Sequence, residues 1–271
     1  MKRLIFGDGK VSKVIRNHTD VIISKKDCNL NDKSKIKEVL RFHKPDIVIN
    51  CAAKTNLEYC QENKSISFDS NVNGVLNVLE ESAEIKSKFI HVSSGCLFDG
   101  NDFISDEKTN PSPSVWYTWT KKWADEIILN FGYENVLILR PRQLISKKPH
   151  PSNMITKFSS MKKIDAIEED NSVTCIEDFS EMINHLIKID GKGIYNCANK
   201  GTVTPYDIAM LVRKYINHDL KVSKIGYNEL LENLPNKRVN TILCTKKIEK
   251  TGFVPRDASE ALEWCVKNYE K

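Results

Sequence analysis

Two side chains separated by one helical turn carry the clearest chemistry in this sequence. Tyr117 and Lys121 stand at positions i and i+4 of the segment YTWTK, and on a helix both side chains project from one face. A neighbouring ammonium favours the phenolate and lowers the pKa of a tyrosine from about 10. Such a tyrosine can give its proton to a carbonyl oxygen while hydride reaches the carbonyl carbon. The spacing alone is common, so its surroundings decide its meaning.

A serine at the end of an apolar segment supplies a third group. Ser94 follows residues 89–92, which we expect to form a strand. Doubly wound parallel sheets bind their ligands at the carboxyl ends of strands. A hydroxyl group there can donate a hydrogen bond to a substrate carbonyl. Ser94, Tyr117 and Lys121, in this order after a glycine turn, resemble the catalytic triad of short-chain dehydrogenases/reductases.

The glycine turn follows the first apolar segment, residues 4–6. Gly7 permits a tight turn, and Gly9 lets the backbone approach a pyrophosphate group at the start of the next helix, around Lys10 and Val11. A lone G-x-G is weak evidence of a binding site. Its position after the first strand of a βαβ pattern favours a dinucleotide site.

The end of the second expected strand bears on the choice of coenzyme. Enzymes that use NAD place a carboxylate there to hold the ribose 2′-hydroxyl. This chain instead has Ser24, Lys25 and Lys26, which suit a 2′-phosphate and favour NADP. Asp27 could take the carboxylate role if the strand ran further, so NAD stays the less favoured alternative.

Apolar runs of strand length alternate with segments of helical periodicity in the first half of the chain. The expected strands are residues 4–6, 21–24, 46–50, 89–92 and 136–139, and the expected helices include residues 33–42, 72–79 and 118–129. This alternation is typical of βαβ units and a parallel sheet. We therefore expect an α/β fold, in which residues 1–145 form a Rossmann-type doubly wound domain that binds the coenzyme.

The pattern loosens in the second half. Residues 179–189, 206–215 and 258–269 are expected to be helical, residues 193–197 to form a strand, and residues 237–244 to be extended. We expect residues 146–271 to form a smaller lobe, part of which returns to the first domain.

The composition is that of an ordinary globular protein. The 271 residues are 40% hydrophobic and 28% charged, with a net charge of +5 carried by scattered lysines, so nucleic-acid binding is not expected. No apolar run reaches about 18 residues, so no membrane partner is expected. The short apolar start does not resemble a signal peptide, which favours the cytoplasm. None of the eight cysteines forms a C-x-x-C pair, so neither a metal site nor a disulfide framework is expected.

Several longer segments resemble the dTDP-4-dehydrorhamnose reductase family. They are KPDIVINCAA at 44–53, NVNG at 71–74, HVSSGCLFDG at 91–100, LRP at 139–141, and RVNTILCT at 238–245 with TGF at 251–253. The resemblance runs in the family's order over nearly the whole chain. It implies a Rossmann domain with a smaller C-terminal sugar-nucleotide-binding lobe, NADP as coenzyme, and a nucleotide-sugar substrate.

The same resemblance implies roles for further residues. Ala52, Ala53 and Lys121 would contact the coenzyme, and Arg238 would reach the diphosphate of the substrate, because arginine forks match phosphate oxygens. The glycine turn departs from the family's G-x-x-G-x-x-G, since it is one residue shorter and has Ser12 at the third glycine position.

Residues after the triad serine distinguish among relatives. Sugar-nucleotide 4,6-dehydratases have an Asp-Glu pair where this chain has Gly95 and Cys96, which disfavours dehydration. Cys96 resembles the acid/base cysteine of GDP-fucose synthase and of the plant-type bifunctional 3,5-epimerase/4-reductase. The plant-type enzymes pair it with a lysine, and here the segment NMITK, from Asn153 to Lys157, stands in that place. Asn153 is then implied to contact the substrate.

Three functional hypotheses follow. The first is a bifunctional 3,5-epimerase/4-reductase that converts a UDP- or dTDP-4-keto-6-deoxyglucose to the L-rhamnose nucleotide with NADPH. The second is a 4-reductase that is fed by a separate epimerase. The third is a non-catalytic regulatory subunit of the same fold, like the methionine adenosyltransferase beta subunit, although the intact triad argues against it. Homodimer formation stays open.

Overall fold

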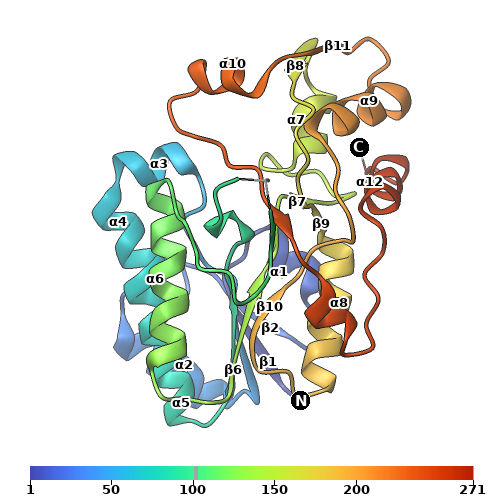
Figure 1. Cartoon of the computed structure of the whole chain (residues 1–271). Helices are drawn as coiled ribbons and strands as arrows, with labels where there is room; N and C mark the ends of the chain where they lie inside the picture. Colours follow the sequence, from blue (N-terminus) through green and yellow to red (C-terminus); the bar gives the residue numbers. More distant parts are fainter. Residues whose placement is uncertain (101–102, 271) are drawn as a thin grey trace. The chain divides into compact units, whose positions relative to one another are not determined.

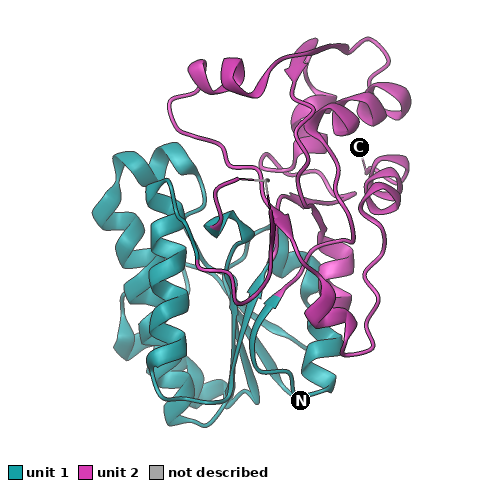
Figure 2. Ribbon diagram, viewed as in Figure 1, with its two compact units in different colours: residues 1–97, 111–140, 183–195 teal, residues 98–110, 141–182, 196–271 magenta. Residues whose placement is uncertain are grey.

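The structure, a computed structural model, describes residues 1–100 and 103–270. It divides into two compact units that alternate along the chain (Figure 2). Unit 1 comprises Met1–Leu97, Pro111–Arg140 and Ile183–Tyr195, and unit 2 comprises Phe98–Asn110, Pro141–Met182 and Asn196–Lys271. The sequence led us to expect a coenzyme domain of residues 1–145 and a lobe of residues 146–271, part of which returns to the first domain. In the structure a late segment, Ile183–Tyr195, belongs to unit 1.

Unit 1 is built on a six-stranded sheet (Figure 1). Its strands are β1 (Arg3–Phe6), β2 (Val21–Ile23), β3 (Ile47–Asn50), β4 (Lys88–Val92), β6 (Val136–Arg140) and β10 (Gly193–Asn196). They lie in the order β2-β1-β3-β4-β6-β10, and all adjacent pairs from β2 to β6 are parallel. The expected α/β fold with a Rossmann-type parallel sheet is confirmed. The strand order changes direction between β1 and β3, and such switch points are where these sheets bind ligands.

Helices cover this sheet, and Figure 1 shows three of them along one of its faces. These three are α2 (Lys33–His43), α5 (Gly74–Glu84) and α6 (Trp116–Asn130). Their apolar stripes, which include Leu40, Leu79 and Ile128, pack with strand residues in one buried cluster. Because α6 follows the expected periodicity closely, its bounds differ from the expected 118–129 by only a residue or two at each end.

Several short helical segments also belong to unit 1, and of these the helix after β1 was expected. They are α1 (Lys10–Ile15), α3 (Leu57–Glu62), α4 (Lys64–Phe68), the π-helical turn η1 (Asp69–Asn73) and, after β4, the 3₁₀ turn η2 (Gly95–Leu97). Asn56 begins α3 by accepting a hydrogen bond from the backbone of Tyr59, as N-cap residues do. Helices of five or six residues present too few apolar positions to show a stripe, which is why α3 and α4 were not expected.

Unit 2 has its own apolar core and three small two-stranded parallel sheets, which pair β5 with β12, β7 with β9 and β8 with β11. The strands are β5 (Ile104–Ser105), β7 (Leu144–Ile145), β8 (Lys163–Ala166), β9 (Thr174–Cys175), β11 (Lys221–Lys224) and β12 (Ile242–Leu243). The helices are α7 (Met154–Ser159), α9 (Pro205–Tyr215), α10 (Tyr227–Glu232), α11 (Lys246–Glu249) and α12 (Ala258–Lys267), and α8 (Ile176–Lys188) runs across the division. The segment expected to be extended at 237–244 forms a strand only at β12. Within the described part of the chain, no helix is both long and apolar enough to cross a membrane.

Candidate active site

The turns after β1 and β3 touch each other at the switch point of the sheet. Gly7 has a φ of 98°, and its N–H donates to the carbonyl oxygen of Ile23 at 2.8 Å. A Cβ atom at Gly7 would lie 2.9 Å from the backbone nitrogen of Ala52. Both the positive φ and this close approach require glycine. The first predicted glycine therefore holds the backbone of Ala52 beside the end of β1.

A cavity of about 310 Å³ opens beside these two turns. Predicted coenzyme residues that line it are Gly7, Gly9, Lys25, Ala52 and Ala53. Its volume lies at the lower end of the range of ligand pockets, and its place at the switch point is that of a nucleotide site. The remaining predicted contacts do not belong to the described lining of this cavity; they are Lys10, Val11, Ser24, Lys26 and Lys121.

The carboxylate of Asp27 is held in a turn after β2. Asp27 Oδ2 accepts hydrogen bonds from the backbone N–H of Ser24 at 2.9 Å and from its hydroxyl at 2.6 Å. These bonds lower the pKa of Asp27. β2 ends at Ile23, so Asp27 does not stand at the strand end, and Lys25 rather than Asp27 lines the cavity.

Lys121 is buried and is bonded to the end of the strand that precedes the triad serine. Its Nζ lies 2.9 Å from the carbonyl oxygen of Val92 and 3.0 Å from Nε2 of His91. Only 1% of the residue is exposed, and this burial lowers its pKa to about 8. A nearby carboxylate, Asp125, works in the opposite direction. An amine with a pKa near neutrality can change its charge during a reaction.

Tyr117 and Ser94 are both largely buried, 8% and 6% exposed, and both belong to unit 1 with Lys121. Tyr117 lies one helical turn before Lys121 on α6. Ser94 Oγ accepts a hydrogen bond from the backbone N–H of Cys96 at 3.1 Å, so the hydroxyl hydrogen of Ser94 can point to another acceptor. Because Lys121 is bonded to Val92, the helix that carries Tyr117 is tied to the strand end that carries Ser94.

Two polar residues in the middle of the sheet were not assigned a role from the sequence. Asn50 and His91 are fully buried, and Asn50 Nδ2 lies 3.3 Å from Nδ1 of His91. Burial lowers the pKa of His91 well below its usual value, so the ring is neutral. A signal was present, because Asn50 interrupts the apolar strand IVIN and His91 interrupts the apolar run FIHV, where apolar residues are usual.

Asn71 is a third buried polar residue to which the sequence analysis assigned no role. It lies in the π-helical turn η1 and is buried. Its amide oxygen accepts from the backbone N–H of Lys54 at 2.7 Å, and its amide nitrogen donates to the carbonyl of Lys54 and to the hydroxyl of Thr120. Asn71 therefore connects the segment after β3 to α6, beside Lys121. π-Helical turns are frequent at functional sites.

The residues proposed to act on the sugar belong to both units. Cys96 is half-buried in η2 of unit 1, whereas Lys157 is exposed on α7 of unit 2. Asn153 begins α7, and its amide nitrogen donates to the carbonyl oxygens of Ser146 and Lys148.

Arg238 is half-buried in unit 2, and one of its guanidinium nitrogens donates to the carbonyl oxygen of Asn236 at 3.3 Å. The assignments of Cys96, Lys157, Asn153 and Arg238 to the substrate stay predictions.

Within the described residues, one group of side chains is close enough to share a metal ion: Cys175, Glu177 and Cys265 of unit 2. The two sulfur atoms lie 3.5 Å apart, and Nη2 of Arg256 lies 3.6 Å from the sulfur of Cys175. The hydrogen bond to Cys175 and burial raise the pKa of Cys265, so its thiol keeps its proton. A protonated thiol beside a guanidinium group is a poor cation ligand, because metals bind thiolates.

Comparison with known proteins finds one family that matches nearly the whole length of the chain. The model of the family described as RmlD substrate binding domain matches residues 9–271. The bifunctional dTDP-4-dehydrorhamnose 3,5-epimerase/dTDP-4-dehydrorhamnose reductase of Arabidopsis thaliana is 29% identical over 237 residues, which cover 83% of this chain and 77% of that protein.

A longer Arabidopsis thaliana protein is the trifunctional UDP-glucose 4,6-dehydratase/UDP-4-keto-6-deoxy-D-glucose 3,5-epimerase/UDP-4-keto-L-rhamnose-reductase. It is 28% identical over 82% of this chain, but the match spans only 34% of its own length. Among solved structures, the dTDP-4-dehydrorhamnose reductase of Bacillus anthracis in complex with NADP superposes with a TM-score of 0.88 at 23% identity, over 97% of both chains.

Proposed function

This chain belongs to the RmlD substrate binding domain family, and we propose that it reduces the 4-keto group of a nucleotide-linked 6-deoxy sugar with NADPH. The observation that carries the proposal is the triad of unit 1. Lys121 is bonded to the end of β4, Ser94 follows that strand, and Tyr117 lies one turn before Lys121. The relatives whose names include a reductase activity support the same reaction.

The residues around the cavity fit the proposed coenzyme. Gly7 leaves room for backbone to approach a phosphate group where a Cβ would collide with Ala52. Lys25 and Lys54 line the cavity with positive charge, and Asp8 is the acidic residue among its described lining. Because Asp27 is bonded to Ser24, the turn after β2 offers a cation rather than a carboxylate, which supports NADPH over NADH.

NADPH supplies a hydride to the carbonyl carbon when it is bound. The protein then has to polarise the carbonyl and deliver a proton to its oxygen. Ser94 donates its hydroxyl hydrogen to the carbonyl oxygen, since its own oxygen already accepts from Cys96. Tyr117 gives its phenolic proton to the developing alkoxide, and the Lys121 ammonium stabilises the phenolate that remains.

The test is to supply UDP- and dTDP-4-keto-6-deoxyglucose with NADPH, each with and without a separate 3,5-epimerase, and to identify the products. Oxidation of NADPH with formation of a 6-deoxyhexose nucleotide supports the reductase. If no keto-sugar nucleotide causes coenzyme oxidation in any arm, the reductase proposal is wrong and the regulatory subunit is favoured.

We propose as a second step that the same chain epimerises C3 and C5 before reduction. A 4-keto group makes these protons acidic, and Cys96 and Lys157 are residue types that can exchange them. The position of Cys96 supports this, because its backbone is bonded to Ser94 in the same short turn. Formation of the L-rhamnose nucleotide without added epimerase is the expected result. If the L-rhamnose nucleotide forms only when an epimerase is added, the chain is a 4-reductase without epimerase activity.

A further inference from the structure

A chain of hydrogen bonds inside unit 1 ends on Lys121. The backbone N–H of Ala52 donates to Oδ1 of Asn50 at 3.1 Å, and Nδ2 of Asn50 lies 3.3 Å from Nδ1 of His91. His91 Nε2 then lies 3.0 Å from Lys121 Nζ, which donates to the carbonyl of Val92 at 2.9 Å. The three side chains are at most 1% exposed, so bulk water does not reach the bonds that join Asn50, His91 and Lys121 to one another.

The direction of the chain is set at its backbone end. A backbone N–H can only donate, so the atom of Asn50 that faces Ala52 is the amide oxygen, and the atom that faces His91 is the amide nitrogen. The amide nitrogen also only donates, which makes Nδ1 of His91 an acceptor. A neutral imidazole with an accepting Nδ1 carries its hydrogen on Nε2. That hydrogen points at Lys121.

Only an uncharged Lys121 completes this arrangement. A neutral amine has one lone pair, which can accept from Nε2–H of His91, whereas an ammonium has donors only. An ammonium would require the other histidine tautomer, whose Nδ1–H would face the amide nitrogen of Asn50. Turning that amide over would set its NH₂ group against the N–H of Ala52. Each of these alternatives leaves two buried donors facing each other, which costs free energy.

We propose that His91 is a positioning residue that favours the neutral amine form of Lys121 over the ammonium, and that the backbone of Ala52 sets the required tautomer through Asn50. Protonation of Lys121 must then break a bond in this chain. Ala52 lines the cavity assigned to the coenzyme, so a ligand that takes the N–H of Ala52 from Asn50 would release the amide and favour the ammonium. This last step rests on the proposed function, whereas the tautomer does not.

The other ionisable groups around Lys121 do not require it to be an ammonium. Burial raises the pKa of Cys51 to about 12, so it is an uncharged thiol. Asp125, one turn later on α6, is paired with Arg140 of β6 at 3.0 Å. Tyr117 lies one turn earlier on the same helix. The lowered pKa values of Lys121 and His91 agree with a neutral pair.

The test reads the tautomer of His91 directly by NMR of ¹⁵N-labelled imidazole rings. The chain has six histidines, and the signals of His91 are those that disappear in His91→Gln. At about pH 9, above the pKa of Lys121, we expect neutral His91 with its hydrogen on Nε2. A hydrogen on Nδ1, or an imidazolium, in the wild-type protein would overturn the proposal without any need for a variant.

Asn50→Asp tests the direction of the chain. The carboxylate still accepts from Ala52 but can only accept from His91, so we expect the hydrogen of His91 to move to Nδ1. Nε2 then accepts from the Lys121 ammonium, and the pKa of Lys121 should rise by about one unit or more. Asn77→Asp is the control, because the Asn77 amide on α5 donates to the carbonyl of Leu30 and not to His91. An unchanged tautomer in folded Asn50→Asp would contradict the proposal.

Activity supplies a separate measurement. If the reductase proposal holds, the alkaline limb of kcat/KM should move to higher pH in Asn50→Asp by the same amount as the pKa of Lys121. If the wild type and Asn50→Asp show the expected tautomers but the protein has no reductase activity, the hydrogen-bond proposal stands and only the proposed function is wrong. If Asn50→Asp is active but its alkaline limb does not move and its His91 tautomer does not change, the proposed function stands and the hydrogen-bond proposal is wrong.

Discussion

Tyr117 is the side chain on which the proposed reduction depends most directly. Tyr117→Phe removes the proton donor and keeps the ring that packs in the site, so kcat should fall by about 10²–10⁴-fold. Far-UV circular dichroism and NADPH binding should not change. Tyr133→Phe is the matched control, because that hydroxyl donates to the carbonyl of Ser87, away from the triad. Activity above about a tenth of the wild-type kcat would identify another acid.

The charge of Lys121 should appear in the pH dependence of reduction. Its pKa is lowered to about 8 by burial, so the ammonium is present below that pH and is lost as the pH rises through it. We expect kcat/KM to fall above about pH 8. Lys121→Arg, if active, should lack this limb, because a guanidinium keeps its proton. A wild-type profile that stays flat to about pH 10 would show that the ammonium is not required.

Lys25 and Lys26 should decide the choice between the two coenzymes. The double variant Lys25→Ala/Lys26→Ala removes two cations after β2, so the KM for NADPH should rise by about tenfold or more, while the KM for NADH changes little. Lys35→Ala is the control, since that lysine is paired with Glu38 on α2. A wild-type protein that used NADH as well as NADPH would refute this assignment.

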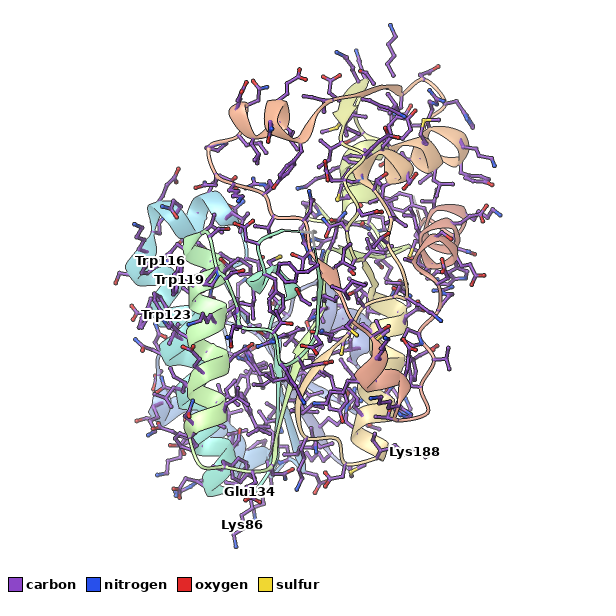
Figure 3. The ribbon with its side chains drawn as sticks, viewed as in Figure 1. Lys86, Trp116, Trp119, Trp123, Glu134 and Lys188 are labelled. Atoms are coloured by element: carbon purple, nitrogen blue, oxygen red, sulfur yellow. The ribbon has the colours of Figure 1, made fainter. Side chains whose placement is uncertain are left out.

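Helix α6 is the element that positions Tyr117 and Lys121, and it is fixed from both sides. Trp123 forms an edge contact with Trp116 and a tilted contact with Trp119, and all three are labelled on α6 in Figure 3. Trp116 Nε1 also donates to the carbonyl of Lys64 on α4. On its buried side the helix is bonded to η1 through Thr120. Two short elements, α4 and η1, therefore hold the helix that the sequence predicted best.

Asn71→Ala tests this support. The change leaves the N–H of Lys54 without its partner and removes one of the two donors to its carbonyl oxygen, which should lower the free energy of unfolding by about 1–3 kcal/mol. Because Thr120 adjoins Lys121, kcat should fall more than the coenzyme affinity does. Urea unfolding and steady-state kinetics measure the two effects. Asn77→Ala is the control, since its amide makes a single bond to Leu30, and an equal loss of kcat there would show that α6 is not specifically affected.

Across the whole chain, the sequence predicted the features that have a local pattern. The strands of the sheet are apolar runs, and the triad has a fixed spacing on α6, so both were recognised. Asn50 and His91 were not assigned because their partners come from other strands, and only the sheet register brings them together. The place of β10 in the sheet escaped prediction for a related reason: β10 joins the sheet beside β6, and nothing in its own four residues indicates that neighbour.

The proposed epimerase and reductase chemistry uses different side chains, and this makes the two activities separable. Cys96→Ser and Lys157→Ala should each stop the exchange of C3 or C5 protons, whereas Ser94, Tyr117 and Lys121 stay unchanged. The measurement is ¹H NMR of the 4-keto-6-deoxyglucose nucleotide in D₂O, which follows deuterium entry at the two carbons. Lys162→Ala is the control, because it removes a lysine that is exposed and lies outside α7.

Rescue distinguishes a lost epimerase from a damaged protein. The acid that donates to C4 is Tyr117, which neither variant touches, so an added 3,5-epimerase should restore formation of the rhamnose nucleotide by the Cys96 variant. Failure of this rescue would mean that Cys96 also serves the reduction, through its backbone bond to Ser94. A wild-type protein that admits no deuterium and makes only the unepimerised product would instead exclude the epimerase and leave the 4-reductase, since reduction of the keto sugar needs no proton exchange at C3 or C5.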